Sequence, residues 1–111
     1  MSQFVSFFSY TDTTWQKLGS TPGDRPAAVE AVARKLGGSV VSLHYMLGPY
    51  DGMVITDLPD TCAAAAMSTV AMCSGAFRQM HTHALLTPDQ LPQILELSRL
   101  GGDSFQAPGS A

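Results

Sequence analysis

The segment Gly48-Pro49-Tyr50-Asp51 separates two strand-like runs of the sequence, and its position decides the order in which the strands follow. The run before it, residues 39–47, is rich in β-branched and aromatic side chains, and the run after it covers residues 53–58. Proline presets the backbone φ of a turn, while glycine and aspartate are common turn residues. The segment therefore predicts a tight connection between an edge strand and a central strand.

Outward from this turn, the apolar pattern predicts a β-α-β-β-α-β order followed by a C-terminal helix. Strands are predicted over residues 3–10, 39–47, 53–58 and 76–86, and helices over residues 22–36, 62–74 and 88–100. Asp60 is predicted to be the N-cap of the second of these helices. Residues 11–18 are predicted to form a turn with no more than one helical turn, capped by Asp12. This order is typical of an α+β, ferredoxin-like fold with an antiparallel four-stranded sheet. We expect a single domain over residues 1–100 and a flexible tail over residues 101–111.

The first strand is apolar on both faces, which predicts that both faces of the sheet are covered. Phe4, Phe8 and Tyr10 lie on one face, and Val5 and Phe7 lie on the other. In the predicted fold the first and third strands are central, and both helices cover one face only. Large exposed apolar patches mark partner surfaces, and only 14% of the residues are charged. We therefore expect a homo-oligomer, at least a dimer, that packs open sheet face against open sheet face.

Five segments occur together, in a set order and spacing, over residues 4–88. They are Phe8-Ser9-Tyr10-Thr11, Gly37-Gly38, Leu47-Gly48-Pro49-Tyr50-Asp51, Pro59-Asp60 followed by Ala63 to Ala66, and Gly75-Ala76-Phe77-Arg78. Together they resemble the GYD domain family of small bacterial proteins, within the dimeric α+β barrel superfamily. The chain departs from the usual family pattern at Thr14-Trp15, where a glycine often follows the first strand. It also has His81 and His83 where hydroxyl or aliphatic residues are more usual.

The resemblance implies a ferredoxin-like protomer in a dimeric α+β barrel. The superfamily includes cofactor-independent monooxygenases, cyclases and haem proteins, so the resemblance leaves the chemistry of this chain open.

His81 and His83 are the residues most suited to chemistry, because positions i and i+2 of a strand point to the same side. Their face is predicted to carry Phe77 as well, and to border a cavity on the sheet or a subunit interface. The two imidazoles can supply two ligands of a metal site, but a third ligand is needed. His44 is the only other histidine, and it lies on the opposite edge strand. We favour a hydrogen-bonded pair at an interface over a metal site.

Other polar side chains have both functional and structural interpretations. Tyr50 and Asp51 can form a donor and acceptor pair in a site, or Asp51 can bind backbone N–H groups near the turn, which we favour. Arg78 can bind a ligand carboxylate or pair with Asp51 or Asp57, and we favour the ion pair.

Three aromatic residues, Tyr10, Trp15 and Tyr45, either line a ligand pocket or pack in a core or an interface. Trp15 is predicted to lie on a loop beside a central strand, where it can act as a lid.

Composition and charge exclude several classes of protein. The net charge is −3 and the six Lys and Arg form no cluster, so we expect no nucleic-acid partner. No apolar stretch is long enough to span a membrane, and the N-terminus lacks a signal-peptide pattern, so we expect a cytoplasmic protein. Cys62 and Cys73 are predicted to be free, buried thiols.

Three functions fit these observations. The first is a protein that binds a small apolar or aromatic molecule in a pocket on the sheet side. The second is a cofactor-independent, monooxygenase- or cyclase-like enzyme, with His81, His83 or His44 as base and Tyr50 or Arg78 stabilising an anion. The third is a metal- or haem-binding protein that uses histidines of the fourth strand. We favour the first, with no cofactor, and the sequence leaves open whether the protein is an enzyme.

Overall fold

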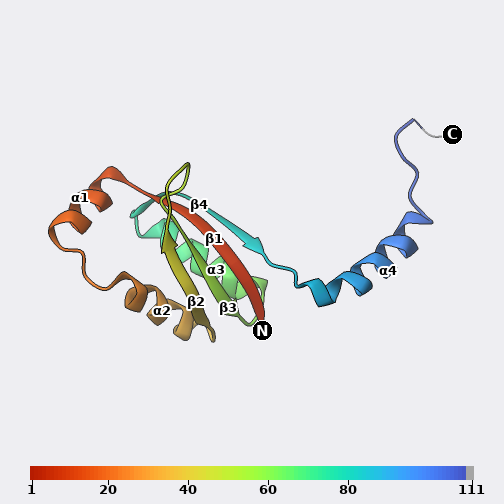
Figure 1. The fold of residues 1–111 in the computed structure, drawn as a ribbon, viewed down its shortest axis with the longest axis horizontal. Helices are drawn as coiled ribbons and strands as arrows, with labels where there is room; N and C mark the ends of the chain where they lie inside the picture. Colours follow the sequence, from red (N-terminus) through yellow and green to blue (C-terminus); the bar gives the residue numbers. More distant parts are fainter. Residues whose placement is uncertain (110–111) are drawn as a thin grey trace.

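A computed structural model describes residues 1–109 and contains a four-stranded antiparallel sheet flanked by helices (Figure 1). The elements follow in the order β1 (Ser2–Tyr10), α1 (Asp12–Ser20), α2 (Arg25–Lys35), β2 (Ser39–Tyr45), β3 (Gly52–Leu58), α3 (Thr61–Cys73), β4 (Phe77–Ala84), the 3-10 turn η1 (Pro88–Gln90) and α4 (Leu91–Gly102). The strand order is β2-β3-β1-β4, so β1 and β3 are central. The predicted ferredoxin-like α+β fold, with its extra C-terminal helix, is confirmed.

Side-chain caps decide where the helices begin. Residues 12–20 form the helix α1, so the prediction of a single turn at most was wrong, and Thr11 rather than Asp12 is its N-cap. The helix α2 starts at Arg25, after Asp24, whose carboxylate accepts a hydrogen bond from the backbone N–H of Ala27 at 3.1 Å. At α3 the predicted cap, Asp60, is confirmed.

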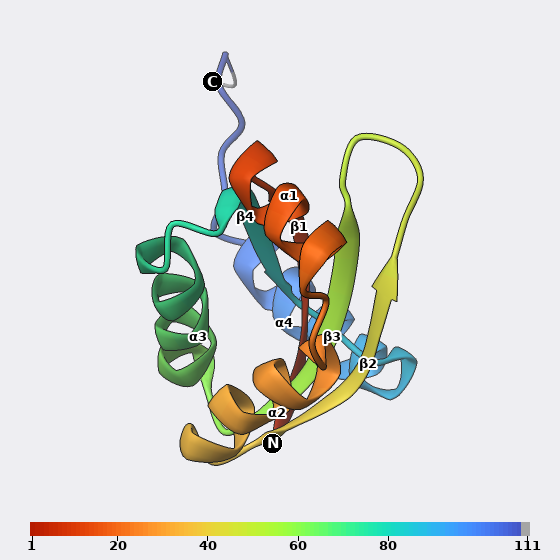
Figure 2. The ribbon, with the colours of Figure 1, turned by 90° about the vertical axis from the view of Figure 1, so that its left-hand side faces the viewer.

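The two faces of the sheet differ in what covers them. Helices α2 and α3 lie on one side of the sheet, which we call the helix face (Figure 2). The core forms there, where Phe4 and Leu58 pack against the small residues Ala33 and Ala64. We call the opposite side the open face. Because side chains alternate along a strand, Phe7 and its cross-strand neighbours Met53 and His81 point to the open face.

A β-bulge changes the face of the sheet on which the first side chains of β4 lie. Ser9 pairs with Gln79, but Tyr10 pairs with Phe77, so Arg78 is an extra residue on β4. An extra residue reverses the alternation of the strand, and Phe77 therefore packs on the helix face against Phe8. The prediction that Phe77 shares a face with His81 and His83 was wrong.

The turn after β2 needs glycine at two positions. Gly48 has a φ of 118°, a conformation that other residues rarely adopt. A Cβ on Gly52 would lie 2.5 Å from Cζ of Phe8, so the first residue of β3 makes room for a core ring.

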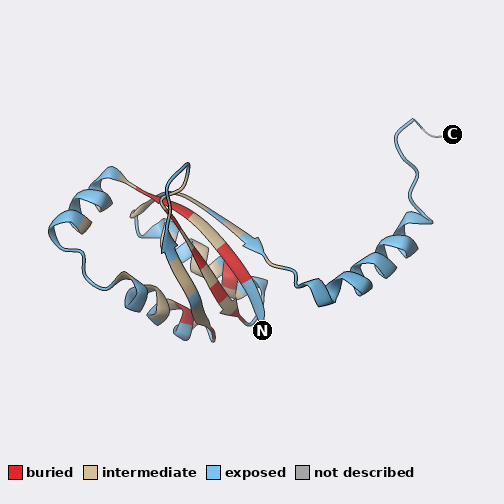
Figure 3. Ribbon diagram, in the orientation of Figure 1, coloured by how far each residue is buried: buried red, intermediate tan, exposed pale blue. Residues whose placement is uncertain are grey.

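Helix α4 projects away from the sheet and gives the molecule a longest dimension of 63 Å (Figure 1). All its residues are exposed (Figure 3). The helix runs to Gly102, so it extends into the predicted tail of residues 101–111, and residues 110 and 111 lie outside the described part of the chain. No helix within residues 1–109 is long and apolar enough to cross a membrane.

Both cysteines are free, as predicted, but they are exposed rather than buried. They lie in the first and last turns of α3, whereas the part of this helix that packs on the core contains Ala63, Ala64 and Met67.

Candidate functional site

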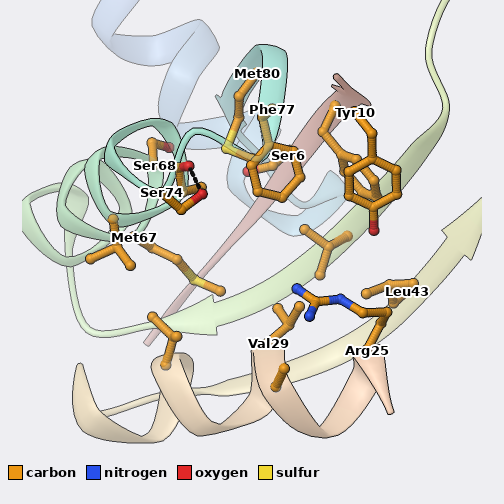
Figure 4. A pocket seen from close by; sticks show the side chains of 16 residues that line it. Ser6, Tyr10, Arg25, Val29, Leu43, Met67, Ser68, Ser74, Phe77 and Met80 are labelled. Carbon is orange, nitrogen blue, oxygen red and sulfur yellow. Dashed lines mark hydrogen bonds between the residues drawn. The ribbon is translucent and has the colours of Figure 1, made fainter. Parts of the chain in front are cut away.

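A cavity of about 260 Å³ lies between the helix face, α2 and α3 (Figure 4). Apolar side chains form most of its walls: Phe8, Val54, Phe77 and Met80 from the sheet, Val29 and Val32 from α2, and Met67 and Ala71 from α3. The sequence predicted a pocket on the face of His81 and His83. The structure instead has this cavity on the helix face.

The cavity exists because α2 and α3 meet at only one end of the sheet. The end of α2 and the start of α3 come together beside Phe4 and Leu58, where Ala33 and Ala64 permit close packing (Figure 2). Further along β1, toward Tyr10, the helices diverge and leave space above Phe8. An interior of apolar side chains is normally filled to high density, so an apolar space of this size is suited to a ligand.

Tyr10 lies at one end of the cavity, and two other predicted residues gather behind it. Its hydroxyl is 3.4 Å from the hydroxyl of Tyr45, and its ring packs edge-on against Trp15 with centroids 5.2 Å apart. Burial raises the pKa of the Tyr10 phenol well above its usual value, and the hydrogen bond with Tyr45 raises it further. The guanidinium of Arg25 opposes this shift. Tyr10 therefore stays a protonated hydrogen-bond donor at neutral pH.

Trp15 belongs to helix α1, not to a loop as predicted, and its ring is held in place. The carboxylate of Asp51 accepts hydrogen bonds from the indole Nε1 of Trp15 at 3.0 Å and from the backbone N–H of Tyr10 at 2.8 Å. Asp51 thus has the favoured structural role, but it binds groups of β1 and α1 rather than N–H groups of its own turn.

Arg78 is exposed in the bulge of β4. The ion pairs within residues 1–109 are Glu30–Arg34 and Glu96–Arg99, so the predicted pairing of Arg78 with Asp51 or Asp57 does not form.

The open face brings three of the predicted residues together around Phe7. The ring centroid of Tyr50 is 5.4 Å from that of Phe7 and 5.6 Å from that of His81. The ring centroids of Phe7 and His83 are 6.0 Å apart. Both histidines are exposed, and the sheet separates them from the cavity. Tyr50, His81 and His83 therefore cannot contact the same small molecule as Tyr10.

His44 lies at the far edge of the sheet, on β2 opposite Met53, as predicted. Within residues 1–109 no three His, Cys, Asp or Glu side chains are placed to hold a metal ion.

Arg25 is the cavity residue that the sequence analysis missed. It is the first residue of α2, and its side chain reaches from that helix into the cavity below Tyr10 (Figure 4). Residues 25, 29, 32 and 36 follow the spacing of one helix face. Extending the apolar stripe of Val29, Val32 and Leu36 back by four residues would therefore have found Arg25.

Comparison with known proteins identifies the chain's relatives. The family model described as GYD domain matches residues 4–95, most of the chain. Among solved structures, the fold is similar to the crystal structure of TTHA0845 from Thermus thermophilus, with a TM-score of 0.50 and 17% sequence identity over 78% of this chain and 95% of that chain. No curated protein matches the chain significantly.

Proposed function

This chain belongs to the GYD domain family, and we propose that it is a homo-oligomeric protein that binds a small apolar or aromatic molecule in the cavity between the helix face, α2 and α3. The observation that carries the proposal is the cavity itself, which is walled mainly by apolar side chains. Its volume of about 260 Å³ lies just below that of pockets for drug-sized ligands, roughly 300–1,000 Å³. The ligand is therefore a small molecule, and burial of its apolar surface drives binding.

The geometry favours a binding protein over an enzyme with a histidine base. None of the residues that line the cavity is a histidine. A general base must lie within about 3 Å of the proton that it removes, or one water away. His81 and His83 are on the other side of the sheet, beyond this reach.

The homo-oligomer is supported by two apolar surfaces that the single chain leaves uncovered. On the open face, Phe7, Met53 and Ile55 are only half-buried. On α4, five large apolar side chains are between 37% and 59% exposed: Leu91, Ile94, Leu95, Leu97 and Leu100. Uncovered apolar areas of this kind mark partner surfaces. A second copy of the chain, packed on the open face, would bury the half-buried apolar side chains of that face.

Narrowing the cavity tests the binding site. Ala71→Leu adds bulk to the α3 wall, while Ala65→Leu adds the same bulk at an exposed position of the same helix. With toluene and indole as probes, followed by amide NMR shifts, we expect binding to Ala71→Leu to weaken about ten-fold or more, because the added side chain occupies ligand space. Ala65→Leu should bind like the wild type. Equal binding by both variants, or probe shifts confined to the open face, would refute the site.

A further inference from the structure

The cavity contains one positive charge among its apolar walls. Arg25 is the only lining residue with a formal charge, and it is half-buried. Arg25 lies in the first turn of α2, at the positive end of the helix dipole, where a positively charged side chain destabilises the helix. Neither core packing nor helix stability therefore accounts for an arginine at this position.

The guanidinium has no carboxylate partner in the described part of the chain, where the ion pairs involve Arg34 and Arg99. The serine hydroxyls of the cavity are bonded elsewhere. Oγ of Ser68 is 2.7 Å from the hydroxyl of Thr82, and Ser74 donates to the backbone carbonyl of Ala71 at 2.5 Å. Inside the cavity the guanidinium lies beside the Tyr10 hydroxyl, and its remaining N–H donors are available to a ligand.

We propose that the ligand is a small organic monoanion, a carboxylate on an aromatic or short aliphatic body, whose carboxylate pairs with Arg25. This inference rests on the proposed function and adds the chemical class of the ligand. A guanidinium binds a planar carboxylate through two parallel N–H···O bonds. A single cation balances one negative charge, and the apolar walls suit the uncharged body.

Tyr10 supplies a second donor on the same side of the cavity. Its hydroxyl and the Arg25 side chain converge on one part of the cavity in Figure 4. The phenol stays protonated, and its single O–H, which lies 3.4 Å from the Tyr45 hydroxyl, can turn from Tyr45 to the carboxylate. Surrounded by apolar walls, such a charge-assisted pair is stronger than it is in water.

Matched acids and amides test the charge separately from the cavity. The probes are benzoate, phenylacetate and octanoate, each compared with its uncharged amide by isothermal titration calorimetry on the full-length protein. The variants are Arg25→Gln, which keeps a polar side chain, and Arg34→Gln. Arg34→Gln removes the same charge from the exposed side of the same helix, where the surface ion pair with Glu30 contributes little.

We expect at least one acid to bind the wild type about ten-fold or more tightly than its amide, and Arg25→Gln to abolish this difference while leaving amide binding unchanged. Arg34→Gln should keep the difference. If amides bind as tightly as acids, the charge assignment fails and the proposed cavity site stands. If neither acids nor amides bind, both fail. Loss of amide binding in Arg25→Gln would assign the residue a structural role and overturn the inference.

Discussion

The two faces of the sheet carry similar apolar side chains but bury them in different ways. On the helix face Phe4, Phe8 and Tyr10 are each no more than 4% exposed. On the open face Phe7 and Ile55 are half-buried, even though they lie on the same central strands.

Val5 is the exception on the open face: it is 6% exposed and lies between Ile55 and His83 of the two neighbouring strands. The helix face is covered by the chain's own helices α2 and α3, whereas the apolar side chains Phe7, Met53 and Ile55 of the open face stay half-buried. We infer that the two faces divide the roles of the protein: one holds the ligand and the other holds the second subunit.

The largest expected effect comes from emptying the core of the helix face. Phe8→Ala removes a ring that is 3% exposed and packs on both Tyr10 and Phe77. We expect it to lower the free energy of unfolding by about 3–5 kcal/mol, measured by urea denaturation. Phe105→Ala, at a position that is 72% exposed, is the control and should change stability by less than about 0.5 kcal/mol.

The adjacent Phe7→Ala sharpens the comparison between the faces. In dilute solution, where an oligomer contributes least to stability, it should destabilise the chain clearly less than Phe8→Ala. Equal losses from the two variants under these conditions would mean that the faces do not differ in the way described.

A smaller effect is expected from the buried phenol of the helix face. The folded protein retains the Tyr10 proton, while the unfolded chain releases it near the ordinary pKa of about 10. Above about pH 10 the unfolded state therefore binds fewer protons, and stability falls as the pH rises, by up to about 1.4 kcal/mol per pH unit for this one group. Below about pH 10 the Tyr10 hydroxyl is protonated in both the folded and the unfolded state, so it adds no pH dependence to the free energy of unfolding.

Urea unfolding between pH 8 and pH 11 measures this loss. We expect Tyr10→Phe to have a shallower loss of stability above pH 10 than the wild type, since phenylalanine has no proton to release. Identical slopes for both proteins would contradict the burial of the Tyr10 hydroxyl.

The pattern of apolar residues was sufficient to predict the sheet and most helices. Strand order follows from the β-α-β-β-α-β succession, and caps such as Asp60 are local features that a sequence displays directly. Helix α1 was missed because residues 12–20 contain small and polar side chains with little apolar periodicity, and the Thr11 cap and the contacts of Trp15 fix the helix there.

The site was harder to predict because it depends on geometry that spans several elements. A single extra residue in β4 moved Phe77 to the other face, which alternation alone cannot reveal. The carboxylate of Asp51 reaches groups of β1 and α1, far from it in sequence. The sequence places Arg25 on the same helix face as Val29 and Val32, but it does not show that this face borders a cavity, because the cavity depends on how α2 and α3 diverge.

The division of roles between the two faces is tested most directly by native mass spectrometry, which reads subunit number and bound small molecule together. The comparison is between the wild type and Phe7→Glu, each with added indole, because a glutamate on the open face places like charges opposite each other in a face-to-face dimer. We predict that the wild type is a dimer or larger and binds indole, and that Phe7→Glu is a monomer that still binds indole. A wild type that is strictly monomeric at micromolar concentration, or a monomeric Phe7→Glu that has lost indole, would contradict the account.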